Sequence, residues 1–162
     1  MSEYQIAQSP RLRTSNATFQ IGARKPFTPS LTFSTPGNLS VTYVRQVGDS
    51  YRIGDLVFCN GYMTLSAFTH TTAADDLLIT GFPYVAKPAS SSGGLGSFGT
   101  LRFSGITKAN YTQFVIEVSP DTTQAVVRCS GSGQTVSIVA ASDMPTGGNV
   151  SFVFSITYLT NE

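Results

Sequence analysis

The chain has 162 residues, a size typical of one domain, and a formal net charge of +1. Its 41% hydrophobic fraction is enough for a sizeable core, which excludes a mostly disordered chain, and the small net charge argues against a general nucleic-acid binder. Only 12% of the residues are charged, while serine and threonine number 20 each and glycine 15. Small hydroxyl residues disfavour long helices and suit strands and turns, so the composition favours an all-β protein.

The N-terminal sequence carries no recognisable export signal. No run of 18 apolar residues occurs in the chain, and residues 1–14 (MSEYQIAQSPRLRT) lack the apolar centre of a signal peptide. We therefore expect synthesis and assembly in a cytosol and no membrane partner. Because disulfides are rare in that compartment, Cys59 and Cys129 are predicted to be reduced thiols in the core, with a disulfide as the alternative.

Residues 1–29 differ from the remainder in charge and pattern. Their net charge is +3, against −2 for residues 30–162, because four basic residues oppose one acidic residue: Arg11, Arg13, Arg24 and Lys25 against Glu3. The segment shows neither a helical nor a sustained alternating period, and three prolines interrupt it. The sequence predicts an extended basic arm at 1–29, either laid on a neighbouring surface or solvated as a tail, followed by one β-domain at 30–162.

From Ser30 onward, short apolar runs alternate with turn formers such as Pro36-Gly37-Asn38 and Gly48-Asp49. The predicted strands are residues 30–35, 39–47, 51–53, 55–67, 76–80, 97–104, 111–119, 123–130, 134–140 and 149–159. In the last of these, apolar residues recur at every second position from Val150 to Tyr158, the pattern of a half-buried antiparallel strand. About ten strands without a credible helix predict an antiparallel β-sandwich of the jelly-roll kind, with a barrel as the alternative.

The predicted strand at 55–67 is apolar on both faces. One face carries Val57, Cys59, Met63 and Leu65, and the other carries Leu56, Phe58 and Tyr62. A second layer of so small a domain covers only one face, so we expect Leu56, Phe58 and Tyr62 to lie in a subunit interface. The alternative is that a loop of the same chain, such as residues 83–96, covers them.

Residues suited to catalysis or metal binding are scarce. The single histidine, His70, lies in a polar Thr-rich segment and is expected to be an exposed loop residue. Asp75 and Asp76 are adjacent, so in a strand they point to opposite faces and cannot act as a pair on one substrate. Two separated cysteines and one histidine do not supply a zinc site, and Asp49 with Asp55 is a weak calcium signal. We expect no enzymatic activity and no cofactor.

Residues 28–65 (TPSLTFSTPGNLSVTYVRQVGDSYRIGDLVFCNGYMTL), with 79–83 (ITGFP) and 153–158 (VFSITY), resemble a β-domain of tailed-phage virion proteins. That domain occurs at the tips of tail fibres and in stand-alone particle proteins. The resemblance implies a trimeric β-sandwich exposed on a virion assembled in the host cytoplasm, with no catalytic residues to transfer. Because only 27 residues precede the matched region, it favours a stand-alone protein over a fibre tip.

The predicted function is accordingly a homotrimeric capsid decoration, or cement, protein. Its arm would bind the major capsid protein through basic and apolar side chains: Ile6, Arg11, Leu12, Arg13, Phe19, Ile21, Arg24 and Lys25. The alternative is a receptor-binding tip of a tail or head fibre, in which loops 68–76 and 86–97 would bind host cell-surface glycan. Neither alternative involves nucleic acid.

Overall fold

The structure is a computed structural model that describes residues 22–89 and 97–161. Within them lie ten strands and one short helix. The strands are β1 (Lys25–Phe27), β2 (Ser30–Thr35), β3 (Ser40–Ile53), β4 (Leu56–Thr69), β5 (Ala74–Thr80), β6 (Ser97–Ser104), β7 (Gln113–Val118), β8 (Gln124–Gly131), β9 (Gln134–Ile138) and β10 (Val150–Leu159). The helix is the three-residue 3-10 turn η1 (Ala141–Asp143). No helix among the described residues has the length and apolar character needed to cross a membrane.

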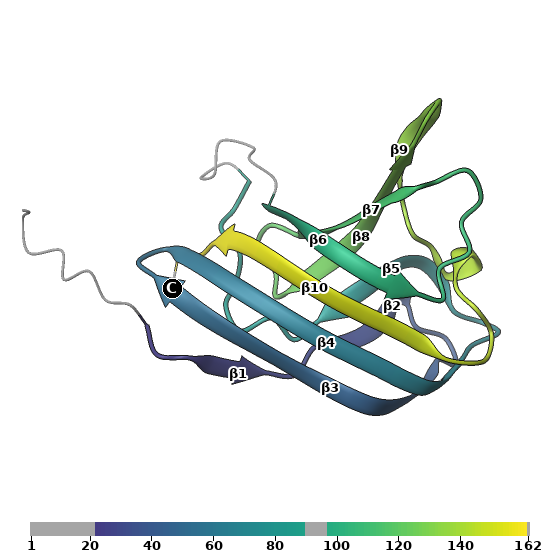
Figure 1. The fold of residues 1–162 in the computed structure, drawn as a ribbon, viewed down its shortest axis with the longest axis horizontal. Coiled ribbons are helices and arrows are strands. Elements are labelled where there is room, and N and C mark those ends of the chain that lie inside the picture. Colours follow the sequence, from purple (N-terminus) through teal and green to yellow (C-terminus); the bar gives the residue numbers. More distant parts are fainter. Residues whose placement is uncertain (1–21, 90–96, 162) are drawn as a thin grey trace, which may run out of the picture.

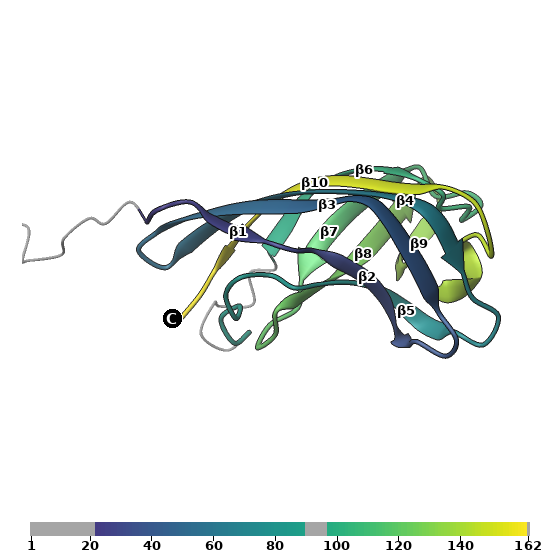
Figure 2. The ribbon, with the colours of Figure 1, turned by 90° about the horizontal axis from the view of Figure 1, so that it is seen from below.

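All strand pairs are antiparallel, and they form one sheet in the order β1-β3-β4-β10-β6-β7-β8-β5-β2, with β9 attached to β8. The sheet curls as a half-barrel, so that β3, β4, β10 and β6 form one layer and β8, β5 and β2 lie behind it (Figures 1 and 2). The predicted all-β antiparallel class is confirmed. The two layers, however, come from one curled sheet, and this strand order does not establish a jelly roll.

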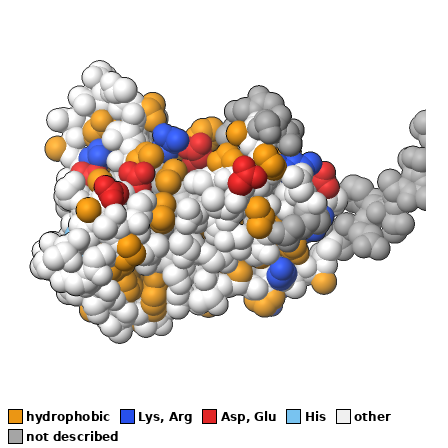
Figure 3. Space-filling view, turned by 180° about the vertical axis from the view of Figure 1, so that it is seen from behind, with side chains coloured by type: hydrophobic (Ala, Val, Ile, Leu, Met, Phe, Trp, Pro, Cys, Tyr) orange, Lys and Arg blue, Asp and Glu red, His pale blue; other side chains and the backbone are white. Residues whose placement is uncertain are grey.

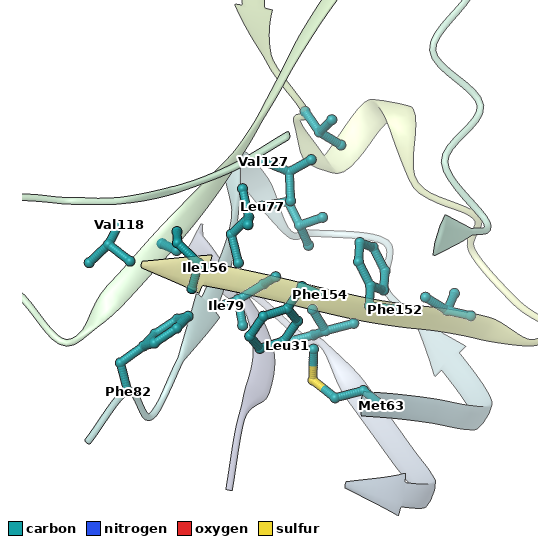
Figure 4. Packing of buried hydrophobic residues seen from close by; sticks show 14 of the residues in the cluster. Leu31, Met63, Leu77, Ile79, Phe82, Val118, Val127, Phe152, Phe154 and Ile156 are labelled. Atoms are coloured by element: carbon teal, nitrogen blue, oxygen red, sulfur yellow. The ribbon is translucent and has the colours of Figure 1, made fainter. Parts of the chain in front are cut away.

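The core fills the space between the two layers. Alternate residues of β4 and β10 point inward, as the apolar period 2 predicted, and meet side chains of β2, β5 and β8 (Figure 4). The least exposed large side chains include Phe33, Met63, Leu77, Ile79, Phe152, Ile156 and Tyr158. Cys59 and Cys129 are both buried and free, as predicted. Burial raises the pKa of the Cys59 thiol to about 12.

The strand at the open side of the half-barrel, β2, is joined to β3 by side chains. The Leu31 amide donates to the Tyr43 hydroxyl at 2.7 Å, and the Gln46 amide nitrogen donates to the Pro29 carbonyl at 3.0 Å and to Ser30 Oγ at 2.8 Å. These contacts give hydrogen-bond partners to polar groups at the edge strand β2. Without them, these groups would bond to water or to a strand of another molecule. Burial also raises the pKa of Tyr43, although the hydrogen bond from Leu31 opposes that shift.

The longest elements are β3 and β4, with 14 residues each. The predicted turn at Gly48-Asp49 is wrong, because β3 passes through it without a break and pairs with β1 on one side and β4 on the other. Gly48 is required there by packing, since a Cβ on it would lie 2.6 Å from the Phe27 ring. The reversal comes instead at Gly54, which has a φ of +57°.

His70 is the second correction. It was expected to be exposed in a loop, yet the side chain is 5% exposed. Its ring lies 4.9 Å from that of Phe33 and 5.5 Å from that of Phe68, between centroids, at the end of the core next to β4. Its Nε2 atom has no hydrogen-bond partner among the described residues. Histidine therefore serves here as part of the aromatic packing of the core.

The first and last described residues lie at the same end of the molecule. The Gly22 amide donates to the Arg52 carbonyl at 2.7 Å, and the Thr160 amide donates to the Asp55 carbonyl at 2.8 Å, so both flank the turn between β3 and β4. The other end carries the loops that join β2 to β3, β4 to β5 and β6 to β7 (Figure 1).

Several polar contacts fasten the loops at that far end. Asn38 Oδ1 accepts from the amides of Thr71 and Thr72 at 2.9 and 3.0 Å. Lys108 Nζ lies 2.6 Å from Asp143 Oδ2, and both side chains are 16% exposed. Burial lowers the pKa of Lys108, but the hydrogen bond and charge of Asp143 outweigh it and leave that pKa raised.

Candidate functional site

The outer face of β3, β4, β10 and β6 carries an exposed aromatic row near the turn between β3 and β4. Tyr51 pairs with Phe58 across β3 and β4, and their side chains are 42% and 38% exposed. Phe98, 56% exposed, lies beside Gly99, which pairs with Ile156 on β10. We call Tyr51, Phe58 and Phe98 the aromatic row. Aromatic side chains with this exposure on a sheet face are typical of contact surfaces.

A groove of about 520 Å³ crosses the same four strands, next to the aromatic row. One wall is a ladder of hydrogen-bonding side chains: Asp49, Asn60, Ser155 and Thr100. The other wall is mainly apolar and ends in a cation: Val47, Tyr62, Val153 and Arg102. Between the walls, the backbone at Gly48, Gly61, Phe154 and Leu101 forms the floor.

The two glycines on the floor have aromatic rings packed against their inner side. A Cβ on Gly61 would lie 2.1 Å from the Phe154 ring, and one on Gly48 would lie 2.6 Å from the Phe27 ring. Gly48 and Gly61 pair directly across β3 and β4. The rings therefore occupy the space that side chains at these two positions would fill.

Charge is unevenly distributed along the groove. At one end, Asp49 Oδ1 is paired at 2.6 Å with Arg24 Nε, and this contact raises the pKa of Arg24. On the apolar wall, the guanidinium of Arg45 lies 4.7 Å from the centre of the Tyr62 ring, a cation–π contact that fixes the ring. Arg102 is exposed at the other end and has no ion-pair partner among the described residues. Among the described residues, Arg102 is thus the cation in the groove lining that has no ion-pair partner, and Arg45 lies beside Tyr62.

The three predicted interface residues lie on this outer face of β4. Phe58 belongs to the aromatic row, and Leu56, which is half-buried, is the first residue of β4. Tyr62 lines the groove and is not part of the aromatic row. The inward assignment of Val57, Cys59, Met63 and Leu65 is confirmed, since each is at most 1% exposed.

Of the predicted arm, two site residues are described, and both contact the β-domain. Arg24 pairs with Asp49, while Lys25 Nζ donates to the Pro83 carbonyl at 3.1 Å and lies 4.2 Å from the centre of the Tyr84 ring. Residues 25–27 form β1, so this part of the arm continues the sheet. The other predicted contacts lie outside the described residues: Ile6, Arg11, Leu12, Arg13, Phe19 and Ile21.

The glycan-binding loops of the alternative prediction are only partly loops. Residues 68–69 end β4 and 74–76 begin β5, and Thr71 and Thr72 between them are bonded to Asn38. Of loop 86–97, residues 90–96 lie outside the described part.

The groove was missed from the sequence because its walls combine residues of four strands, and only the pairing register makes them neighbours.

The chemistry available in the groove is that of binding. Its lining supplies an amide, hydroxyls, one carboxylate already paired with arginine, an aromatic ring and a free guanidinium. Within the described ranges, no three His, Cys, Asp or Glu side chains come together as metal ligands. On the opposite side of the molecule, narrow hydrophobic strips lie among uncharged atoms in the lower half of the view, and most of the visible charged side chains lie in the upper half (Figure 3).

Comparison with known proteins identifies the fold. No family model and no curated protein matches the chain. Among solved structures, it is similar to the Dettilon tailspike protein, with a TM-score of 0.60 and 15% sequence identity. The match covers 84% of this chain but only 23% of that one, so this chain corresponds to about a quarter of the tailspike's length. At this identity the match shows a shared fold.

Proposed function

We propose that this chain is a non-enzymatic structural protein of a tailed-phage virion, acting at the tail as a surface-contact domain. The observation that carries the proposal is the shared fold with part of a tailspike protein. The resemblance of residues 28–65 to virion β-domains points in the same direction. The outer face of the sheet, with its aromatic row and groove, supplies the contact surface.

We further propose that the protein is a homotrimer whose subunits meet at the aromatic row and at Leu56. Three exposed aromatic side chains on one face exceed the scattered apolar exposure that monomers tolerate. A stable contact of this type buries on the order of 1,000 Å² or more in total.

The arrangement of the chain gives such a trimer a polarity. Gly22 lies beside the turn between β3 and β4, so in this proposal the basic residues that precede it contact neighbouring virion components from that end. The far end, whose loops are fastened by Asn38 and by the Lys108–Asp143 pair, faces outward in this arrangement.

A second candidate, a capsid decoration protein bound to the major capsid protein, is favoured by the +3 charge of residues 1–29. Arg24 and Lys25 already have partners within the chain, so Arg11 and Arg13 would provide the basic contacts of such an arm. The candidates differ in copy number and place. Labelled protein found in a few copies on the tail supports our proposal, and hundreds of copies on the head refute it in favour of decoration.

The trimer is tested by light scattering of purified protein at micromolar concentration. The wild type is expected to give three chains, and the double variant Phe58→Ser, Phe98→Ser is expected to dissociate. The matched control Val44→Ser removes a side chain that is 71% exposed outside the aromatic row, so it is expected to remain trimeric. A wild-type protein that stays monomeric throughout this range would contradict the trimer.

A further inference from the structure

The two walls of the groove differ in chemistry. Asp49, Asn60, Ser155 and Thr100 present hydrogen-bonding groups in one line, because they are successive partners across β3, β4, β10 and β6. The opposite wall presents the Tyr62 ring and two valines in a parallel line. A ligand that fills this groove needs hydroxyls on one side and an apolar face on the other, and sugars have both.

The dimensions of the groove fit a short chain of such units. It crosses four strands, which are about 4.8 Å apart, so it is roughly 14 Å long. Its volume of about 520 Å³ lies within the usual range for small-molecule sites.

The charged side chains at the groove favour an acidic sugar over a neutral one. Asp49 is neutralised by Arg24, while Arg102 at the other end is unpaired among the described residues and Arg45 adds a second cation beside Tyr62. A planar guanidinium binds a carboxylate with two parallel hydrogen bonds, which makes Arg102 the natural anchor for an acidic group. We propose that the groove binds a short oligosaccharide carrying a carboxylate, with the acidic sugar at Arg102.

Two other occupants fit less well. Residues 1–21 of a second copy carry Arg11 and Arg13 against Glu3, so their charge repels Arg102 and Arg45. A second copy that covered the groove itself, and not only the neighbouring aromatic row, would have to satisfy the hydrogen-bonding groups of the polar wall. Charge complementarity therefore favours the acidic sugar.

This inference deepens the proposed function by naming a ligand, but it is tested on purified protein, independently of where the protein sits on a particle. The probes are trigalacturonate and trisialic acid, with maltotriose as a neutral probe of equal length. Binding is measured by calorimetry and by amide shifts in ¹⁵N-labelled full-length protein. We expect millimolar or tighter binding of at least one acidic probe, weaker binding of maltotriose, and shifts centred on Asn60, Gly61 and Ser155.

Two variants locate the site. Arg102→Gln is expected to weaken binding of the acidic probe about tenfold or more and to reduce its preference over maltotriose. Tyr62→Ala is expected to weaken both kinds of probe. The control Lys87→Gln also removes one positive charge, but its partner is Asp55 at the turn between β3 and β4, so it should bind as the wild type does.

Three results would overturn the inference. One is equal binding of acidic and neutral probes with no effect of Arg102→Gln. Another is the absence of binding and of shifts at 10 mM probe. The third is binding that appears only in the dissociated Phe58→Ser, Phe98→Ser variant and not in the wild-type trimer, which would assign the groove to a second copy. None of these results bears on the virion location, and a head location would leave sugar binding intact.

Discussion

Replacing Gly61 by alanine tests whether the floor of the groove is as tightly packed as the structure indicates. The new Cβ would lie 2.1, 2.4 and 2.8 Å from three atoms of the Phe154 ring, whereas carbon atoms in contact stay about 3.5 Å apart. The ring must therefore retreat by about 1.4 Å. Phe154 is 3% exposed and packs against Phe82 at 5.8 Å, so the space for that movement is limited.

Forced overpacking of this kind costs typically 1–3 kcal/mol, and we expect Gly61→Ala to lower the free energy of unfolding by about 2–3 kcal/mol. For a domain of this size, that corresponds to a fall in Tm of roughly 4–12 °C. The assay is denaturant unfolding, supported by a thermal scan at fixed protein concentration.

The matched control is Gly147→Ala, because a Cβ there meets nothing within 4 Å and the backbone is not in the left-handed region. It should leave stability unchanged or raise it slightly. The double variant Gly61→Ala, Phe154→Leu replaces the ring by a smaller side chain. Its loss in unfolding free energy should be smaller than the sum of the losses in the two single variants. If Gly61→Ala unfolds within 0.5 kcal/mol of the wild type, the packing argument for the glycine is refuted.

Three further changes test other parts of the fold by the same unfolding assay. His70→Ala should lower the free energy of unfolding by about 2–3 kcal/mol, because it leaves a cavity. His70→Phe should leave that free energy nearly unchanged, because it fills the space and removes the unpaired Nε2. Equal losses in the two variants would contradict the packing role. Because the pKa of Cys59 is raised in the folded state, stability should fall as pH rises above about 8.5, where the unfolded thiol ionises, by at most ~1.4 kcal/mol per pH unit. Cys59→Ala should flatten this dependence between pH 8 and 10, and an unchanged slope would exclude the thiol as its source. Asp143→Ala should lower the free energy of unfolding by about 1–3 kcal/mol, because it leaves the Lys108 ammonium without its partner. Adding Lys108→Met should recover part of this loss. If it recovers none, the Asp143 carboxylate stabilises the fold through its hydrogen bond from the Ala140 amide instead.

The sequence was most informative where a single strand carries its own pattern. The alternation from Val150 to Tyr158 predicted both β10 and its inward face, and residues 30–35 and 97–104 were placed with the observed bounds. In these strands, burial of one face is a local property of the residues themselves. The same reasoning assigned the inner face of β4 correctly.

Prediction failed where the deciding partner lies far away in the chain. Gly48 was assigned to a turn because glycine is common in turns, but its role depends on the ring of Phe27. His70 was assigned to a loop from its polar neighbours, but Phe33 and Phe68 bury it. The groove depends on the register of four strands, which no local pattern encodes.

The position of the two described chain ends has a practical consequence. Gly22 is hydrogen-bonded to Arg52 at the end of β3, and Thr160 to Asp55 in the turn that follows, so these two described residues lie close together. The domain could therefore be inserted into a surface loop of another protein, or circularly permuted by a short linker joining these ends, without stretching any strand. Every loop at the far end would keep its spacing in such a chimera.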